Sequence, residues 1–244
     1  MTKIIGFHQP IFAIHNCSMS QHINNTILLI NTALQEASVG IAVDGQLIDQ
    51  ISNLSQKEHA SFLHPAIQSI CKKNDITLKS LKAVSVINGP GSYTGLRVGL
   101  SAAKGICYAN QIPLICINTL EWIAFGNREQ AKDLIVPMID ARRMEVFTAV
   151  YSRDLNTLFA PSNLILDEQS YAGYLNTQQV LFVGDGAAKW QELCKHPNAQ
   201  FPASLQNESH HAAIAEDCFL KSNFPSLFEA APFYTKDFFS TQRG

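Results

Sequence analysis

The segment 84–110, VSVINGPGSYTGLRVGLSAAKGICYAN, constrains the fold more than any other part of the chain. Its β-branched apolar start predicts a buried strand over 82–87. The run Asn-Gly-Pro-Gly at 88–91 then favours a tight turn. Ser92 and Thr94, which follow, carry hydroxyl groups suited to capping a helix start. We therefore predict a strand, a glycine turn and a helix, which is a unit of α/β proteins.

This unit supports two uses. The first is anion binding at the start of the helix, and its candidate nucleotide contacts are Gly89, Gly91, Ser92, Thr94 and Arg97. The second is close packing, because the predicted helix 95–109 has small residues four apart along one face. The glycine spacing fits neither Gly-x-x-x-x-Gly-Lys-Ser/Thr nor Gly-x-Gly-x-x-Gly, the common phosphate-binding patterns. The sequence thus favours packing over phosphate and leaves both open.

Composition narrows the class of protein. The 244 residues are 46% hydrophobic and 16% charged, which is typical of a packed globular chain with one large domain or two modest ones. The net charge of −2 gives no global basic field for nucleic acid, so a role on RNA would need a local patch or a partner. Six cysteines without a Cys-x-x-Cys pair favour reduced, buried thiols in the cytoplasm. No apolar run reaches the roughly 20 residues of a membrane span, so we expect no membrane contact.

The order of the predicted elements restarts halfway along the chain. With an offset of 109 residues, Ile30-Asn31 falls on Ile139-Asp140 and Glu36 falls on Glu145. Both halves begin with a strand-rich unit and continue as α/β. The predicted strands are 26–31, 37–43, 46–51, 82–87, 114–117, 134–139, 145–151 and 180–183, and the predicted helices are 58–73, 95–109, 169–175, 210–222 and those beginning at Thr119 and Ala187.

We therefore divide the chain into duplicated β-β-β-α-β-α-β-α units. The first α/β domain spans 26–130, and a second, shortened one spans 131–244. Residues 1–25 show no clean period, and we predict an accessory extension, either disordered or added by a start codon assigned too early, with Met19 as the true start.

The polar residues at the predicted strand ends offer little catalytic chemistry. Asn31 ends the first strand, and its amide brings no charge to Mg²⁺. Asp140 keeps a carboxylate at the matching place, and we interpret it as a strand-end cap or an arginine partner. His59 and His64 lie about 140° apart around a helix, so they cannot share a metal ion. We predict no catalytic residue and no metal site.

Several segments together resemble a known family. The strings ILLINTALQEASVGIAVDG, EHASFLHPAI, GPGSYTGLRVGLSAAKG, PLICINTLEWIA, IDARRMEVFTAVY and VGDG occur in one order over about 26–190. They resemble the TsaB (YeaZ) family, the dimerisation subunits of the bacterial tRNA threonylcarbamoyladenosine machinery. The resemblance implies an ASKHA fold, the actin-like and sugar-kinase-like duplicated α/β architecture, with a shortened second unit. It also implies a part in forming N6-threonylcarbamoyladenosine at position 37 of tRNAs that read codons starting with A.

The same resemblance implies a non-catalytic chain. The related catalytic subunit, TsaD, holds a metal ion with a His-x-x-x-His pair whose positions fall here on Thr119 and Ile123. Neither residue ligates a metal as histidine does. Asn31 likewise replaces the carboxylate usual at the first phosphate loop. The family thus implies no intrinsic cofactor, while ATP or ADP at the subunit interface is left open.

The resemblance also implies partners. It predicts a heterodimer with TsaD, a homodimer when the chain is alone, the accessory ATPase TsaE as a further partner, and contact with tRNA only through the complex. The pairing would use the predicted helices 58–73 and 95–109. The interface residues that we predict are Leu63, Ile67, Ile70, Gly95, Gly99 and Ala103. The alternatives are an ASKHA ATPase or phosphotransferase, or a metalloprotease-like enzyme, acting alone.

Overall fold

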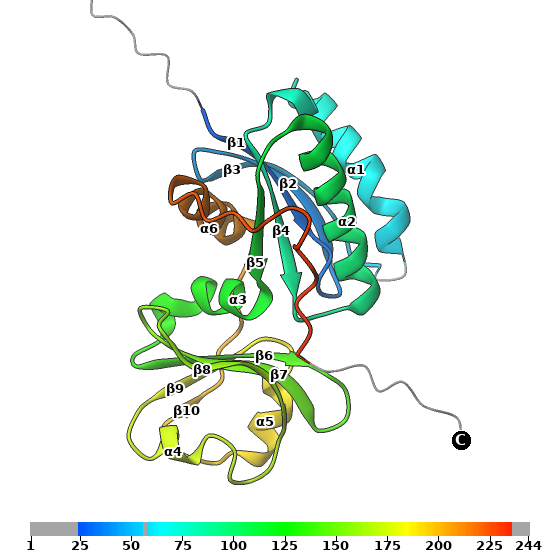
Figure 1. Ribbon diagram of the computed structural model, residues 1–244. Helices are drawn as coiled ribbons and strands as arrows, with labels where there is room; N and C mark the ends of the chain where they lie inside the picture. The colour runs from blue at the N-terminus through cyan, green and yellow to red at the C-terminus, as the bar shows by residue number, and fades with distance from the viewer. Residues whose placement is uncertain (1–23, 56–57, 236–244) are drawn as a thin grey trace, which may run out of the picture.

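The computed structural model describes residues 24–55 and 58–235. These residues form two lobes, each built on a five-stranded mixed sheet (Figure 1). The predicted extension 1–25 lies outside the described residues except for Asn24 and Asn25. Asn25 is tied to the first lobe, since its side-chain amide donates to Glu216 Oε1 at 2.7 Å.

The first sheet has the strand order β3-β2-β1-β4-β5. Strand β1 (Thr26–Asn31) lies in its centre and pairs antiparallel with β2 (Ala37–Val43), which continues into β3 (Gln46–Asn53) through the tight turn at Asp44-Gly45. On the other side of β1, strands β4 (Ala83–Gly89) and β5 (Leu114–Asn118) run parallel to it. The predicted strands of this half are confirmed.

The second sheet repeats this order as β10-β9-β6-β7-β8. Its central strand β6 (Leu134–Asp140) pairs antiparallel with β7 (Glu145–Ser152), which in turn pairs antiparallel with the edge strand β8 (Thr157–Ile165). On the other side of β6, strands β9 (Val180–Val183) and β10 (Ala199–Gln200) run parallel to it. The duplicated ASKHA architecture is therefore confirmed. The sequence did not predict β8 or β10, because β8 is a largely exposed edge strand and β10 has only two residues.

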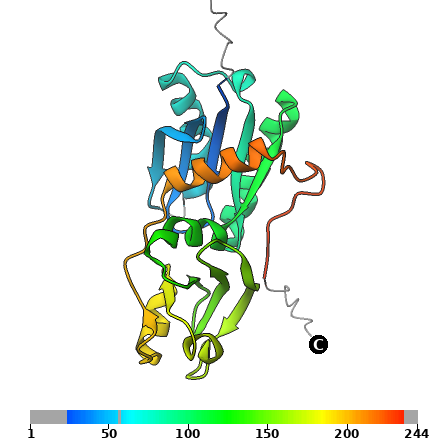
Figure 2. The ribbon, with the colours of Figure 1, turned by 90° about the vertical axis from the view of Figure 1, so that its left-hand side faces the viewer.

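The helices cover the outer faces and fill the space between the lobes. Helices α1 (His59–Lys73) and α2 (Tyr93–Asn110) lie side by side on one face of the first sheet, and α6 (Glu208–Leu220) lies on the other (Figures 1 and 2). Helix α3 (Thr119–Asn127) lies between the two sheets. Two short helices, α4 (Ala172–Leu175) and α5 (Ala187–Leu193), pack on the outer face of the second sheet.

Three predicted helices differ from their expected bounds, and one of them, α2, begins two residues before the predicted Gly95. The helix predicted at 169–175 is reduced to α4, because the chain before it forms turns and Tyr171 has a left-handed backbone. The helix predicted from 210 begins two residues earlier, because Asn207 caps it by accepting from Ser209 N and His210 N. This helix, α6, follows the second lobe in sequence but packs on the first sheet, as the orange helix in Figure 1 shows. The predicted division at residue 131 stays a prediction.

Three apolar clusters hold the elements together. The largest one joins the facing sides of both sheets with α3 and α6, and it contains Ile27, Ile139 and Ala212. A second cluster fills the space between the first sheet and the α1–α2 pair, and a third lies beneath the second sheet around Trp190. Burial of each large side chain stabilises the fold by about 1.5–3 kcal/mol. The two lobes therefore share one continuous interior.

The cysteines that the structure describes carry free thiols, and all of them are buried or half-buried. Burial raises the pKa of Cys107 to about 12 and that of Cys116 to about 11. The prediction of reduced, unpaired thiols is confirmed for these residues, while Cys17 lies outside the described part of the chain. None of the described helices combines the length and the apolar character that crossing a membrane requires.

Candidate functional site

The glycine turn after β4 is filled by the chain's own backbone. Gly89 has φ +125°, and a Cβ atom built there would overlap the carbonyl oxygen of Phe233. A Cβ atom on Gly91 would overlap the carbonyl oxygen of Ala33. These two glycines are therefore needed for close internal packing, which is the use that the sequence favoured.

The first turn of α2 is clamped by the β1–β2 turn. Ser92 caps the helix, because its Oγ accepts from Gly95 N at 3.3 Å, as predicted. Ser92 N donates to the carbonyl of Ala33 at 2.7 Å, and Thr32 Oγ1 donates to the carbonyl of Gly95 at 2.7 Å. A donor that could meet an anion at this helix start is thus already used within the chain.

The small-residue face of α2 points inward. A Cβ atom on Gly95 or Gly99 would overlap an oxygen of Thr32, and Ala103 is fully buried. The predicted α1 contacts Leu63, Ile67 and Ile70 are buried as well and pack in the cluster beneath the helices. All six predicted interface residues thus make contacts inside the chain, and their contact with a partner stays a prediction.

The surface left open on the α1–α2 pair is a shallow groove. Its volume is about 560 Å³. It is lined by Ala60 and His64 of α1 and by Arg97, Val98, Ser101, Ala102, Gly105 and Ile106 of α2. Gly105 differs from Gly95 and Gly99, because a Cβ atom there would meet nothing within 4 Å. The groove is thus an exposed surface between the two helices, whereas the small-residue stripe packs inside the chain.

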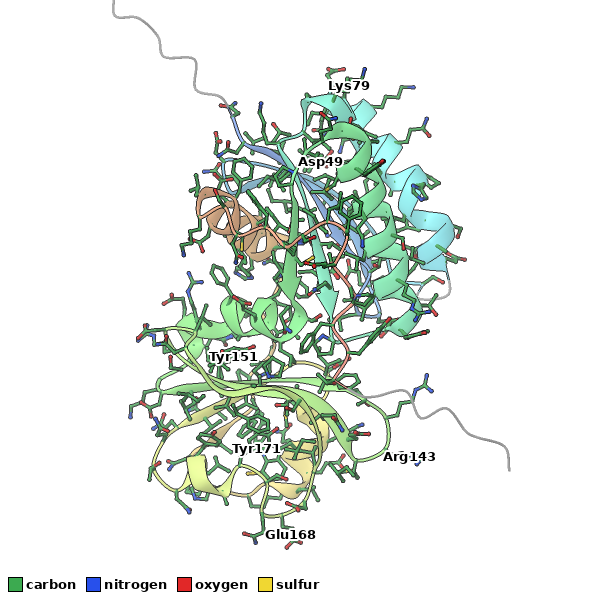
Figure 3. The ribbon with its side chains drawn as sticks, viewed as in Figure 1. Asp49, Lys79, Arg143, Tyr151, Glu168 and Tyr171 are labelled. Carbon is green, nitrogen blue, oxygen red and sulfur yellow. The ribbon has the colours of Figure 1, made fainter. Side chains whose placement is uncertain are left out.

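A second open region is the cleft between the two lobes. It measures about 830 Å³, and Ser92, Tyr93 and Thr94 line one wall while residues around the β6–β7 turn line the other. Arg142 and Arg143 form that turn with left-handed backbones, and Arg143 lies at the edge of the second lobe (Figure 3). Of the predicted nucleotide contacts, Gly91, Ser92 and Thr94 therefore line the cleft, whereas Arg97 lines the groove and Gly89 is packed internally.

Asp140 and Asp185 lie together on the second-lobe wall of this cleft. Asp140 N donates to Asp185 Oδ1 at 2.9 Å, while Asp140 Oδ1 accepts from Lys189 Nζ and from Arg142 N, both at 2.6 Å. Partial burial raises the pKa of Asp140, but these hydrogen bonds outweigh it and hold the pKa below its ordinary value. The predicted strand-end cap is confirmed, with Lys189 as the charged partner in place of an arginine guanidinium.

Asn31 takes part in a buried polar network that the sequence did not predict. Its Nδ2 donates to Glu208 Oε1 at 3.1 Å, and Ser38 Oγ donates to the same oxygen at 2.7 Å. The other carboxylate oxygen lies 2.8 Å from His211 Nδ1, and His211 Nε2 lies 2.9 Å from Ser85 Oγ. Burial raises the pKa of Glu208, but the His211 ring and these donors outweigh it and lower the pKa.

The order serine, histidine, carboxylate in this network is that of hydrolase triads. Here Ser85 and His211 are 0% exposed and Glu208 is 5% exposed, so no substrate reaches the serine. The network instead fastens α6 to strands β1, β2 and β4. The sequence did not reveal this network, because the residues that form it come from distant segments and no nucleophile-elbow motif frames the serine.

The positions that would hold a metal ion in the catalytic relative are closed. Thr119 is the first residue of α3 and Ile123 lies one turn further along it, and both are 0% exposed. His59 is buried with Nε2 3.1 Å from the carbonyl of Gln35, whereas His64 lies in the exposed groove. Within 24–55 and 58–235, no three His, Cys, Asp or Glu side chains gather as a metal site.

Comparison with known proteins places this fold among named relatives. A family model described as TsaD, tRNA N6-adenosine threonylcarbamoyltransferase, matches residues 51–238. The tRNA threonylcarbamoyladenosine biosynthesis protein TsaB of Escherichia coli is 34% identical, over 69% of this chain and 75% of its own. The protein of the same name from Bacillus subtilis is 32% identical, over 69% of this chain and 74% of its own. The solved structure of YeaZ from Pseudomonas aeruginosa superposes with a TM-score of 0.72 at 22% identity, over 86% of this chain and 99% of that one.

Proposed function

Because the chain belongs to the TsaB (YeaZ) family, we propose that it takes part in forming N6-threonylcarbamoyladenosine in tRNA. The curated relatives from E. coli, B. subtilis and Haemophilus influenzae are all named for the biosynthesis of this nucleoside. The nucleoside would be the one at position 37 of tRNAs that read codons starting with A. The cytoplasm is the compartment in which we expect this work.

Within that pathway we propose a non-catalytic role. The observation that supports it is the burial of Thr119 and Ile123, where the catalytic relative would need two metal ligands. Asn31 adds to it, because its amide is engaged by Glu208 and carries no charge. The chain would act as a scaffold that binds and activates the catalytic subunit TsaD.

The groove between α1 and α2 is the surface that we propose for this partner. It is exposed, partly apolar and formed by two helices that pack firmly on the first sheet, so it is a preformed docking face. Alone, the chain would pair with a second copy through the same helices. TsaE would join this complex. The chain would contact tRNA only through the complex, and ATP or ADP would bind at the subunit interface near Ser92 and Thr94.

The alternatives draw less support. A solved relative is described by similarity to a peptidase, but here Ser85 of the serine–histidine–carboxylate set is sealed in the interior. An independent ATPase or a metalloprotease-like enzyme would show metal in the purified protein or ATP turnover by the isolated chain. Substantial metal content or turnover would contradict the non-catalytic assignment.

Reconstitution tests the proposal. Unmodified tRNA is incubated with TsaD, TsaE, the adenylate-forming enzyme and this chain, and the modified nucleoside is measured by mass spectrometry. We expect modification to depend on this chain. Equal modification in a reaction without it would show that the proposed function is wrong.

A further inference from the structure

Helices α1 and α2 carry positively charged side chains and no carboxylates. Neither helix contains an Asp or Glu residue, whereas together they carry Lys72, Lys73, Arg97 and Lys104. Lys73 is paired with Asp49 at 2.8 Å, and Lys104 Nζ donates to the carbonyl of Ala230 at 2.9 Å. Among the described residues that line the groove, Arg97 is the only lysine or arginine.

Arg97 is held in place by two tyrosine rings. Its guanidinium carbon lies 4.0 Å from the centroid of the Tyr93 ring, and its Nε donates to Tyr234 OH at 3.1 Å. The two rings lie 5.5 Å apart. Among the described residues no carboxylate lies within ion-pairing distance of Arg97. Its positive charge is thus oriented but not neutralised.

Tyr234 comes from the C-terminal segment 226–235, which runs along α2 (the red segment in Figure 1). The segment is anchored at several points. Phe233 N donates to the carbonyl of Asn88 at 2.8 Å, and Lys104 donates to the carbonyls of Phe228 and Ala230. Gly89 lacks the Cβ atom that would block Phe233. These contacts hold the segment along α2 and place the hydroxyl group of Tyr234 beside Arg97.

We propose that Arg97, positioned by Tyr93 and Tyr234, makes the groove select a non-identical partner that presents a carboxylate. In a twofold pair of identical chains the same surface is used on both sides. Two copies of this groove would bring two positive charges and, from α1 and α2, no carboxylate. A different chain with an Asp or Glu among apolar residues would complement it. Like charges disfavour a pairing and complementary charges favour it.

The inference rests on the proposed function, since it specifies the partner of the same groove. The proposed function and the proposed role of Arg97 can nevertheless be refuted independently. If the wild-type chain does not bind TsaD, the proposed function is wrong. If it binds, and Arg97 is irrelevant to that binding, only the present inference is wrong.

The test measures two equilibria for the variant Arg97→Gln. Binding to TsaD is followed by calorimetry, and self-association by sedimentation. We expect the dissociation constant with TsaD to rise about ten-fold, as for a lost charge-assisted hydrogen bond, and the self-association of Arg97→Gln to become tighter. Added salt should weaken binding to TsaD in the wild type and should have less effect in the variant. Lys195→Gln, which removes a positive charge from the second lobe, should change neither equilibrium.

Two further variants separate charge from packing. Tyr234→Phe keeps the ring and removes the hydroxyl group, so it should weaken TsaD binding less than Arg97→Gln does. Arg97→Glu should associate with the wild-type chain more tightly than either does with itself. An unchanged dissociation constant for Arg97→Gln with TsaD, or weaker self-association of that variant, would overturn the inference.

Discussion

The two classes of glycine on α2 yield a prediction that needs no partner. Gly99 and Gly105 lie in the same helix, but a Cβ atom on Gly99 would overlap Thr32 Oγ1 and lie 3.4 Å from Ile30 Cγ2, whereas one on Gly105 would meet nothing within 4 Å. Alanine in place of glycine favours a helix by about 1 kcal/mol at either position. The difference between the two variants therefore reports the packing against β1.

At Gly99 the added methyl group must displace Thr32. Overpacking of this kind costs roughly 1–3 kcal/mol. Moving Thr32 also breaks its hydrogen bond to the carbonyl of Gly95, which contributes about 1 kcal/mol. We expect Gly99→Ala to destabilise the chain by about 1–3 kcal/mol net, while Gly105→Ala stabilises it by up to about 1 kcal/mol.

Urea denaturation followed by circular dichroism measures both variants against the wild type, and the midpoint gives the change in the free energy of unfolding. Equal midpoints for Gly99→Ala and Gly105→Ala would refute the inward packing of the small-residue face. The same reasoning bears on interface mapping. A bulky residue at Gly99 would disturb β1 before it met any partner, so variants at Arg97 are the better probes.

Two more predictions concern buried groups. Burial raises the pKa of Glu208, but its hydrogen-bond donors outweigh burial and lower the pKa, so the ionised carboxylate stabilises the fold above the ordinary glutamate pKa of about 4.3. This stability is lost as the pH falls through the folded-state pKa. Acid denaturation of Glu208→Gln should lack this part of the pH dependence, and an unchanged profile would contradict the assignment. The thiols of Cys107 and Cys116, with pKa values raised to about 12 and about 11, should react with Ellman's reagent at pH 8 only on unfolding, and fast labelling of the native chain would show that they are accessible.

Much of the local structure was accessible from the sequence. The hairpin at Asp44-Gly45, the strand before the glycine turn and the cap at Ser92 follow from residue types that favour one backbone conformation. The duplication was visible because equivalent strands end at Asn31 and Asp140, 109 residues apart. Strand β8 was missed, since an exposed edge strand has little apolar periodicity to detect.

The direction in which each face points was decided by tertiary structure. The spacing of Gly95, Gly99 and Ala103 shows that one face of α2 is small, but only the position of Thr32 shows that this face meets the chain's own first strand. The partners of Asn31 and Arg97 come from Glu208 and Tyr234, more than a hundred residues away. The local pattern of the sequence indicates which face of a helix or strand can be buried. Contacts between distant segments depend on how the whole chain packs, and they determine which groups remain exposed to another molecule.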